Sequence, residues 1–213
     1  MAKRTGKRLP REQLLKRRVP ELGYYLIVTD TKATEQNYIA GLRDSIPKKL
    51  QGKIVVKVCR AETAKLVDEA LSMASMHPQY SEPWIVFDRD QVKDFDRIIA
   101  NAEGKGIKVG WSNPCIEIWF SAYLGAMPVC QDSVTCNDNF EARYFNITGH
   151  RYDKTDSAIY SKLCRFGDEK QAFSLAKQKL LEHARNNKTQ PSNMCPATKL
   201  HILVEEINNK VVR

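Results

Sequence analysis

The chain has 213 residues, of which 42% are hydrophobic, and its formal net charge is +9. This length supports one sizeable hydrophobic core with room for a small accessory lobe. No apolar run approaches the roughly 18 residues that a membrane span needs, and the basic N-terminus lacks the apolar segment of a signal peptide. We therefore expect a cytoplasmic protein that is neither exported nor inserted in a membrane.

Six cysteines are scattered along the chain without a C-x-x-C pair, and Cys130 and Cys136 are the closest two. Without a secretory context, the simplest interpretation is reduced thiols, several of them buried. A zinc site would require paired spacing, which this sequence lacks, so the pattern disfavours zinc.

Most of the net positive charge lies in a basic N-terminal arm, residues 1–20, which contains a single acid, Glu12. Such arms often contact nucleic-acid phosphates. A solvated tail that only aids solubility explains the same composition. If the arm does bind nucleic acid, the contacts are its eight basic residues: Lys3, Arg4, Lys7, Arg8, Arg11, Lys16, Arg17 and Arg18.

Predicted strands and helices alternate after the arm. Runs rich in β-branched and aromatic residues predict strands at 23–29, 53–59, 84–87 and 107–111. Helical periodicity follows each strand, at 38–46, 62–76, 92–103 and 116–124. For the last of these helices, Asn113 is the expected cap and Pro114 the first helical residue. This alternation is typical of βαβ units, so we predict an α/β fold with a mainly parallel sheet.

The C-terminal part is predicted to be helical after a polar segment. Residues 127–150 show few periodic signals, and we expect a loop or a small insertion there. Helices are predicted at 155–166, 170–185 and 198–209. We accordingly divide the chain into the arm (1–20), an α/β core (21–126) and a loop and helical part packed on the core (127–213).

Asp88 and Asp90 follow the third predicted strand, in the sequence WIVFDRD. Along an extended chain they project to one side and Arg89 to the other. Two carboxylates at the end of a buried strand are costly unless a cation lies between them, and Mg²⁺ prefers such oxygen ligands. The alternative, in which Asp90 caps the next helix and Asp88 is solvated, explains these two residues equally well.

Two more carboxylates are expected at the same edge of the sheet. Asp30 ends the first strand, and Glu117 lies in the first turn of the helix after the fourth strand, among apolar neighbours. A glutamate in such a run is rarely buried without a partner, although the helix dipole alone also favours it. Together the four acids favour a metal-supported site at the edge where α/β sheets bind ligands.

The segment GHRYDKT holds further polar candidates. Lys154 or His150 near a metal site could stabilise phosphate charge or transfer a proton. The simpler interpretation of this segment is a helix entry with Thr155 or Asp156 as its cap.

The order strand–carboxylate–helix followed by strand–DxD resembles the TOPRIM domain of topoisomerases, primases and OLD-type nucleases. Over about residues 22–208 the chain resembles more closely the RloB-like family of small TOPRIM proteins. The resemblance implies a TOPRIM-like, Rossmann-like fold with a C-terminal helical extension. The segments that carry it are YYLIVTDTKATEQNYIAGL, WIVFDRD, WSNPCIEIWFSAYL, HRYDKTDSAIY and PATKLHILVEEI.

The resemblance also implies a Mg²⁺-dependent phosphodiester site, with Mn²⁺ as an alternative ion. Asp88 and Asp90 match the DxD pair of the family, Glu117 the glutamate of SNPC-x-E, and Lys154 the lysine of the late motif. Asp30 stands where members have a glutamate, because DTKATE replaces the usual EGEKTE. The implied metal ligands are Asp30, Asp88 and Asp90, and the altered first motif implies changed or absent turnover.

The leading hypothesis is a metal-dependent nuclease that cleaves DNA or RNA, tRNA included, in anti-phage defence by abortive infection. Family members are often encoded beside an ABC-type ATPase, so the resemblance implies such a partner and leaves a homo-oligomer open. The alternative is a catalytically degenerate TOPRIM module that binds nucleic acid, nucleotide or a partner protein without cutting. A nucleotidyl or phosphoryl transferase is the third and weakest hypothesis.

Overall fold

The computed structural model describes residues 22–30, 33–59, 62–90 and 92–211. Its centre is a five-stranded sheet in the order β2-β1-β3-β4-β5. The first four of these strands are parallel and β5 is antiparallel to β4, which confirms the predicted α/β class and mainly parallel sheet. The strands are β1 (Tyr25–Thr29), β2 (Ile54–Val58), β3 (Glu82–Asp88), β4 (Lys108–Asn113) and β5 (Ala197–Thr198).

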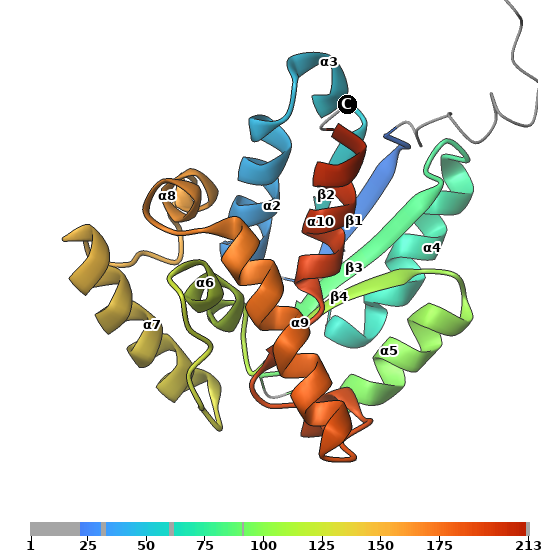
Figure 1. The fold of residues 1–213 in the computed structure, drawn as a ribbon. Helices are drawn as coiled ribbons and strands as arrows, with labels where there is room; N and C mark the ends of the chain where they lie inside the picture. Colours follow the sequence, from blue (N-terminus) through green and yellow to red (C-terminus); the bar gives the residue numbers. More distant parts are fainter. Residues whose placement is uncertain (1–21, 31–32, 60–61, 91, 212–213) are drawn as a thin grey trace, which may run out of the picture.

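Helices cover both faces of the sheet (Figure 1). On one face α4 (Leu66–Met76) and α5 (Phe95–Gly104) enclose a core with Leu26 and Ile85. On the other face α2 (Thr34–Ser45) and α10 (Leu200–Val211) enclose a second core. Strand side chains alternate between the two cores because successive residues of a strand point to opposite faces.

A group of helices extends the second core away from the sheet. α6 (Glu117–Tyr123) lies at its centre, and Figure 1 shows α7, α8 and α9 around it. All seven residues of α6 are buried, which explains its strongly apolar sequence. The surrounding helices and the short ones are α7 (Ser133–Thr148), α8 (Ile159–Phe166), α9 (Glu169–Arg185), α3 (Lys48–Gln51), and the 3₁₀ turns η1 (Thr63–Lys65) and η2 (Pro191–Asn193).

The strand order creates a switch point between β1 and β3. The chain goes outward from β1 to β2 and then returns across β1 to β3, so the two connections leave the sheet in opposite directions. In open α/β sheets, ligands bind beside the carboxyl ends of the strands at such a point. Asp30 directly follows β1 and Asp88 ends β3, which places both acids there.

Of the two alternatives for residues 127–150, a loop or a small insertion, the loop is wrong, because α7 occupies Ser133–Thr148. The helix has clear end signals. Asp132 accepts a hydrogen bond from the Thr135 N–H at 2.7 Å, and Gly149 ends the helix in the left-handed region with φ 72°. The buried face of α7 is narrow and consists of Cys136, Phe140 and Tyr144. The helical periodicity of apolar residues in this segment is therefore weak.

Three predicted helix caps are also wrong. Asn113 is the last residue of β4 and donates hydrogen bonds to the carbonyls of Pro191 and Ser192, whereas α6 begins only at Glu117. α8 begins at Ile159 with Ala158 as its N-cap, so neither Thr155 nor Asp156 caps it. Asp90 caps nothing, since α5 begins at Phe95.

Within the described residues no helix is long and apolar enough to cross a membrane. All six cysteines are free thiols, and four of them are buried, as expected. The proposed domain boundaries stay a prediction.

Candidate functional site

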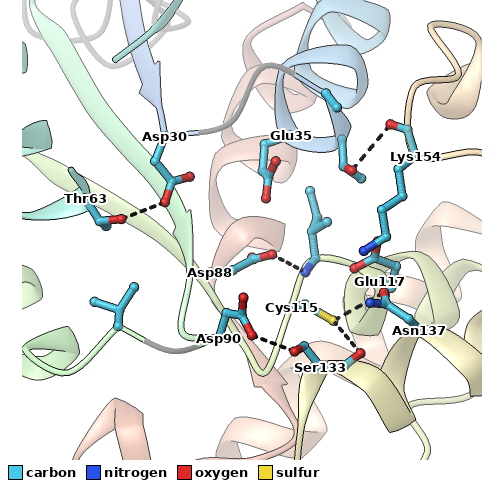
Figure 2. A pocket seen from close by; sticks show the side chains of 14 residues that line it. Asp30, Glu35, Thr63, Asp88, Asp90, Cys115, Glu117, Ser133, Asn137 and Lys154 are labelled. Atoms are coloured by element: carbon cyan, nitrogen blue, oxygen red, sulfur yellow. Dashed lines mark hydrogen bonds and ion pairs between the residues drawn. The ribbon is translucent and has the colours of Figure 1, made fainter. Parts of the chain in front are cut away.

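A pocket of about 490 Å³ opens at the carboxyl ends of β1 and β3. The five predicted pocket residues all line it: Asp30, Asp88, Asp90, Glu117 and Lys154. Figure 2 shows the carboxyl groups of Asp30 and Asp88 facing the same hollow, with Asp90 below them and Glu117 beside Lys154 across from them. The eight basic residues predicted to contact nucleic acid lie in the arm, outside the described residues.

Asp88 lies half-buried at the floor of the pocket. Its Oδ2 accepts a hydrogen bond from the Ile116 N–H at 2.9 Å, which ties the end of β3 to the turn before α6. Burial and the nearby carboxyl of Glu35 raise the pKa of Asp88 well above its usual range. An acid in this situation favours either a bound proton or a bound cation.

Asp30 lies on the β1 side of the pocket. Its Oδ2 accepts a hydrogen bond from the Thr63 hydroxyl at 3.0 Å. Its Oδ1 is buried and has no hydrogen-bond partner among the described residues. Burial raises the pKa of Asp30 despite the Thr63 hydroxyl, which lowers it. A buried carboxylate oxygen without a partner is costly, and a cation in the pocket would remove that cost.

Asp90 is exposed and lies in a strained turn rather than in β3. Its φ is 30°, a left-handed value that is uncommon for a residue with a side chain. The Asp90 N–H donates to the Pro114 carbonyl at 2.9 Å, and its Oδ1 accepts from the Ser133 hydroxyl at 2.6 Å. Contacts with α7 and with the turn before α6 hold this conformation, which brings the Asp90 side chain to the pocket. The alternation of side chains along an extended strand does not apply to Asp90, because this residue lies beyond β3.

Glu117 and Lys154 form the far wall. Glu117 is only 2% exposed, and its Oε1 accepts a hydrogen bond from the Tyr152 hydroxyl at 3.0 Å. Lys154 Nζ lies 3.6 Å from the same oxygen. The charge of Glu117 is therefore already balanced within the protein, unlike that of Asp30 and Asp88. His150, the other candidate in this segment, is exposed and does not line the pocket.

Glu35 is a pocket residue that the sequence analysis missed. It lies in the first turn of α2, is only 3% exposed, and points into the hollow between Asp30 and Asp88 (Figure 2). Burial and the charge of Asp30 raise the pKa of Glu35 to about 7, against the lowering effect of its hydrogen bond with Asp88. Two carboxyl groups can share a hydrogen bond only if one is protonated.

The signal that could have identified Glu35 was its place in the chain. It begins the helix that follows the first strand, so it belongs to the same sheet edge as Asp30. Read by itself, a first-turn glutamate is ordinary in a helix.

The donor chemistry of the pocket suits a hard divalent cation, because several desolvated carboxylates converge there with raised pKa values. In the part of the chain that the structure describes, no three His, Cys, Asp or Glu side chains already close around one point. Mg²⁺ does not require such a cage, since it retains waters and uses one or two carboxylates. Asp30 and Asp88 are the residues best placed to hold it.

The protein-family model described as RloB-like protein matches residues 25–207 of the chain. The chain belongs to the RloB-like family. The match includes both switch-point strands and every pocket residue named above, and it confirms the family expected from the motifs. No curated protein matches this RloB-like chain, and no solved structure matches it.

Proposed function

We propose that this RloB-like protein is a Mg²⁺-dependent nuclease, with Mn²⁺ as an alternative ion, that hydrolyses phosphodiester bonds of DNA or RNA. The observation that carries the proposal is the convergence of Asp30, Glu35 and Asp88 on one pocket at the switch point, with raised pKa values that a cation would reverse. A TOPRIM-type site is the family interpretation of this arrangement.

In this proposal the divalent ion, when bound, polarises the scissile phosphate and lowers the pKa of a bound water. Asp30 and Asp88 would hold the ion, and the Ile116 N–H keeps the Asp88 carboxylate in place. Glu35, whose buried carboxyl points into the hollow between these two acids, would accept a proton from the attacking water. Lys154, which is 54% exposed at its side chain, offsets charge on the phosphate.

The biological setting of the proposal follows from the family. We infer a role in anti-phage defence with an ABC-type ATPase as partner, and sequence-independent contact of the basic arm with nucleic acid. Arm contacts with phosphate weaken steeply as salt concentration rises. Co-purification with an ATPase encoded beside the gene tests the partner, and salt titration of nucleic-acid binding by full-length and arm-deleted protein tests the arm.

The decisive experiment is a cleavage assay on DNA and on total RNA, with Mg²⁺ or Mn²⁺. We expect Asp88→Ala and the isosteric Asp88→Asn to abolish cleavage while circular dichroism shows a native fold. Asp138→Asn, which changes an exposed acid of α7 outside the pocket, is the matched control and retains full activity. Cleavage by Asp88→Asn at the wild-type rate would remove Asp88 from the site.

A second candidate is a module that binds nucleic acid, nucleotide or a partner protein without cutting. The shorter acid at position 30, where family members have a glutamate, favours it. It predicts that the wild-type protein binds Mn²⁺ or nucleic acid but leaves every substrate in the assay intact.

A further inference from the structure

Four of the six cysteines meet beside the acidic pocket, although they are far apart in the sequence. Cys115 follows β4 and lines the pocket, Cys130 precedes α7, Cys136 lies in the first turn of α7, and Cys195 precedes β5. Their side chains interact in an unbroken series, Cys115 with Cys136, Cys136 with Cys130, and Cys130 with Cys195. All four are free thiols.

The series is not arranged as a metal site. A structural zinc needs four ligands around one point, and among the described residues no three His, Cys, Asp or Glu side chains are grouped in this way. Thiols that share side-chain hydrogen bonds with their neighbours in a series are instead placed to form a disulfide between adjacent members.

Cys130 and Cys195 are the adjacent pair that contains the most exposed thiol of the series, Cys195. Cys195 is partly exposed, whereas Cys130 is 3% and Cys136 is 1% exposed. The Cys195 thiol also donates a hydrogen bond to the Cys130 carbonyl at 3.0 Å, which fixes it beside Cys130. An oxidant that approaches at Cys195 therefore meets this thiol and its neighbour Cys130 first.

The hydrogen bonds of this pair favour a reactive thiolate at Cys130. Hydrogen bonds from Cys136 and Cys195 lower the pKa of Cys130 to about 4. The hydrogen bond with Cys130 and burial raise the pKa of Cys195, so Cys195 remains a thiol beside the Cys130 thiolate. The thiolate, not the thiol, is the species that attacks an oxidant.

We propose that Cys130 and Cys195 form a reversible oxidation site, at which a peroxide converts their two thiols into one intramolecular disulfide. The Cys130 sulfur attacks a peroxide oxygen, the O–O bond breaks, and a sulfenic acid and water form. The Cys195 sulfur then attacks the Cys130 sulfur and expels the hydroxyl, which leaves as water. Two thiols and one hydrogen peroxide thus give one disulfide and two waters.

The site is mechanically connected to the acidic pocket. Cys130 lies just before the start of α7, where Ser133 donates its hydrogen bond to Asp90. Cys136 in the same turn interacts with Cys115, a pocket residue. Drawing Cys130 toward Cys195 shifts this end of α7 and loosens the Ser133–Asp90 contact. The effect on the pocket rests on the proposed metal function, whereas the disulfide itself does not.

The test treats the reduced full-length protein with hydrogen peroxide and counts free thiols after denaturation. We expect the number to fall from six to four, a peptide map to show a Cys130–Cys195 link, and dithiothreitol to restore six. Cys195→Ser and Cys195→Ala should each abolish the intramolecular link. Cys164→Ser, which removes the exposed thiol outside the series, is the matched control and retains the link.

Mn²⁺ affinity, measured by calorimetry, reports on the pocket independently of cleavage. We expect oxidation to weaken Mn²⁺ binding about tenfold, the usual cost of losing a supporting contact to a ligand, and Cys195→Ser to be insensitive to peroxide. A Cys130–Cys136 link, retention of all six thiols, or stoichiometric zinc in the purified protein would overturn the oxidation site. An intact link with unchanged Mn²⁺ binding would overturn only the connection to the pocket.

Discussion

The Tyr152 hydroxyl donates a hydrogen bond to Glu117 Oε1 at 3.0 Å, and this contact joins the segment before α8 to the buried first turn of α6. Because Glu117 is almost fully enclosed, the contact orients the one pocket acid whose charge is balanced by Lys154. Tyr152→Phe removes only the hydroxyl. We expect cleavage to fall about tenfold and stability to fall by about 1 kcal/mol.

Urea unfolding and cleavage rates measured side by side test this expectation. Tyr80→Phe, a partly buried tyrosine packed in the other core, is the control. Full activity in Tyr152→Phe would show that Lys154 alone is sufficient to position Glu117.

Stability of the metal-free protein should depend on pH through Glu35. Its pKa is raised to about 7 in the folded state, above its ordinary value of 4.5, so the folded state binds more protons between these values. Stability from this group is therefore complete below about pH 4.5 and is lost as pH rises through 7. The expected loss is roughly 3 kcal/mol.

Glu35→Gln isolates this effect, because glutamine cannot ionise. Thermal or urea unfolding from pH 5 to pH 8 should show a smaller decline for the variant than for the wild type, and higher stability of the variant at pH 8. Glu141→Gln changes an exposed acid of α7 and should follow the wild-type curve. Parallel curves for Glu35→Gln and wild type would mean that Glu35 is not desolvated in solution.

A divalent ion should stabilise the folded protein, since it binds the folded pocket and relieves the repulsion among its acids. We expect Mg²⁺ or Mn²⁺ at about 100 times its Kd to add roughly 2.7 kcal/mol. The increase in melting temperature should be largest at pH 8 and absent in Asp88→Asn. An equal increase in Asp88→Asn would place the ion elsewhere.

Asp30→Glu separates the two candidate functions. The longer side chain keeps the charge and extends the carboxylate farther from β1, beyond the Thr63 hydroxyl that now holds it. If the wild type is a nuclease, the variant should still cleave, with a changed rate. Metal-dependent cleavage that occurs only in Asp30→Glu would establish the natural protein as a module that binds without cutting.

The packing of α2 on α8 should tolerate no added methyl at Gly41. A Cβ there would lie 2.6 Å from the Tyr160 Cβ, which cannot move without shifting the backbone. We expect Gly41→Ala to cost about 1–3 kcal/mol. Gly52→Ala, with no heavy atom within 4 Å of its Cβ, is the matched control and should be near neutral.

The strands and most helices of this fold could be predicted because their apolar residues alternate or recur regularly. α7 could not, since its buried residues Cys136, Phe140 and Tyr144 form a stripe only one residue wide, while other apolar residues of the helix, such as Phe145, are exposed. Asp132 and Gly149 marked its ends, but the sequence alone does not tell a cap from a turn.

The residues of the pocket, like the helices, could be predicted only in part. Asp30 and Asp88 follow from the general rule that parallel strands end at one edge. Glu35 and Tyr152 do not, because their roles depend on where α2 and the segment before α8 pack. The contacts among Cys115, Cys130, Cys136 and Cys195 arise from the same tertiary packing, and no spacing in the sequence reveals them.

The pocket is closed by contacts between distant parts of the chain. Thr34 beside Glu35 donates to the Lys154 carbonyl across 120 positions, and Asn37 donates to the Thr155 carbonyl across 118. During synthesis, a ribosome-bound chain that has formed the acidic edge of the sheet still lacks this wall. The acids at the ends of β1 and β3 are therefore synthesised well before the lysine that faces them, and the site can be completed only after Lys154 and Thr155 have been added to the chain.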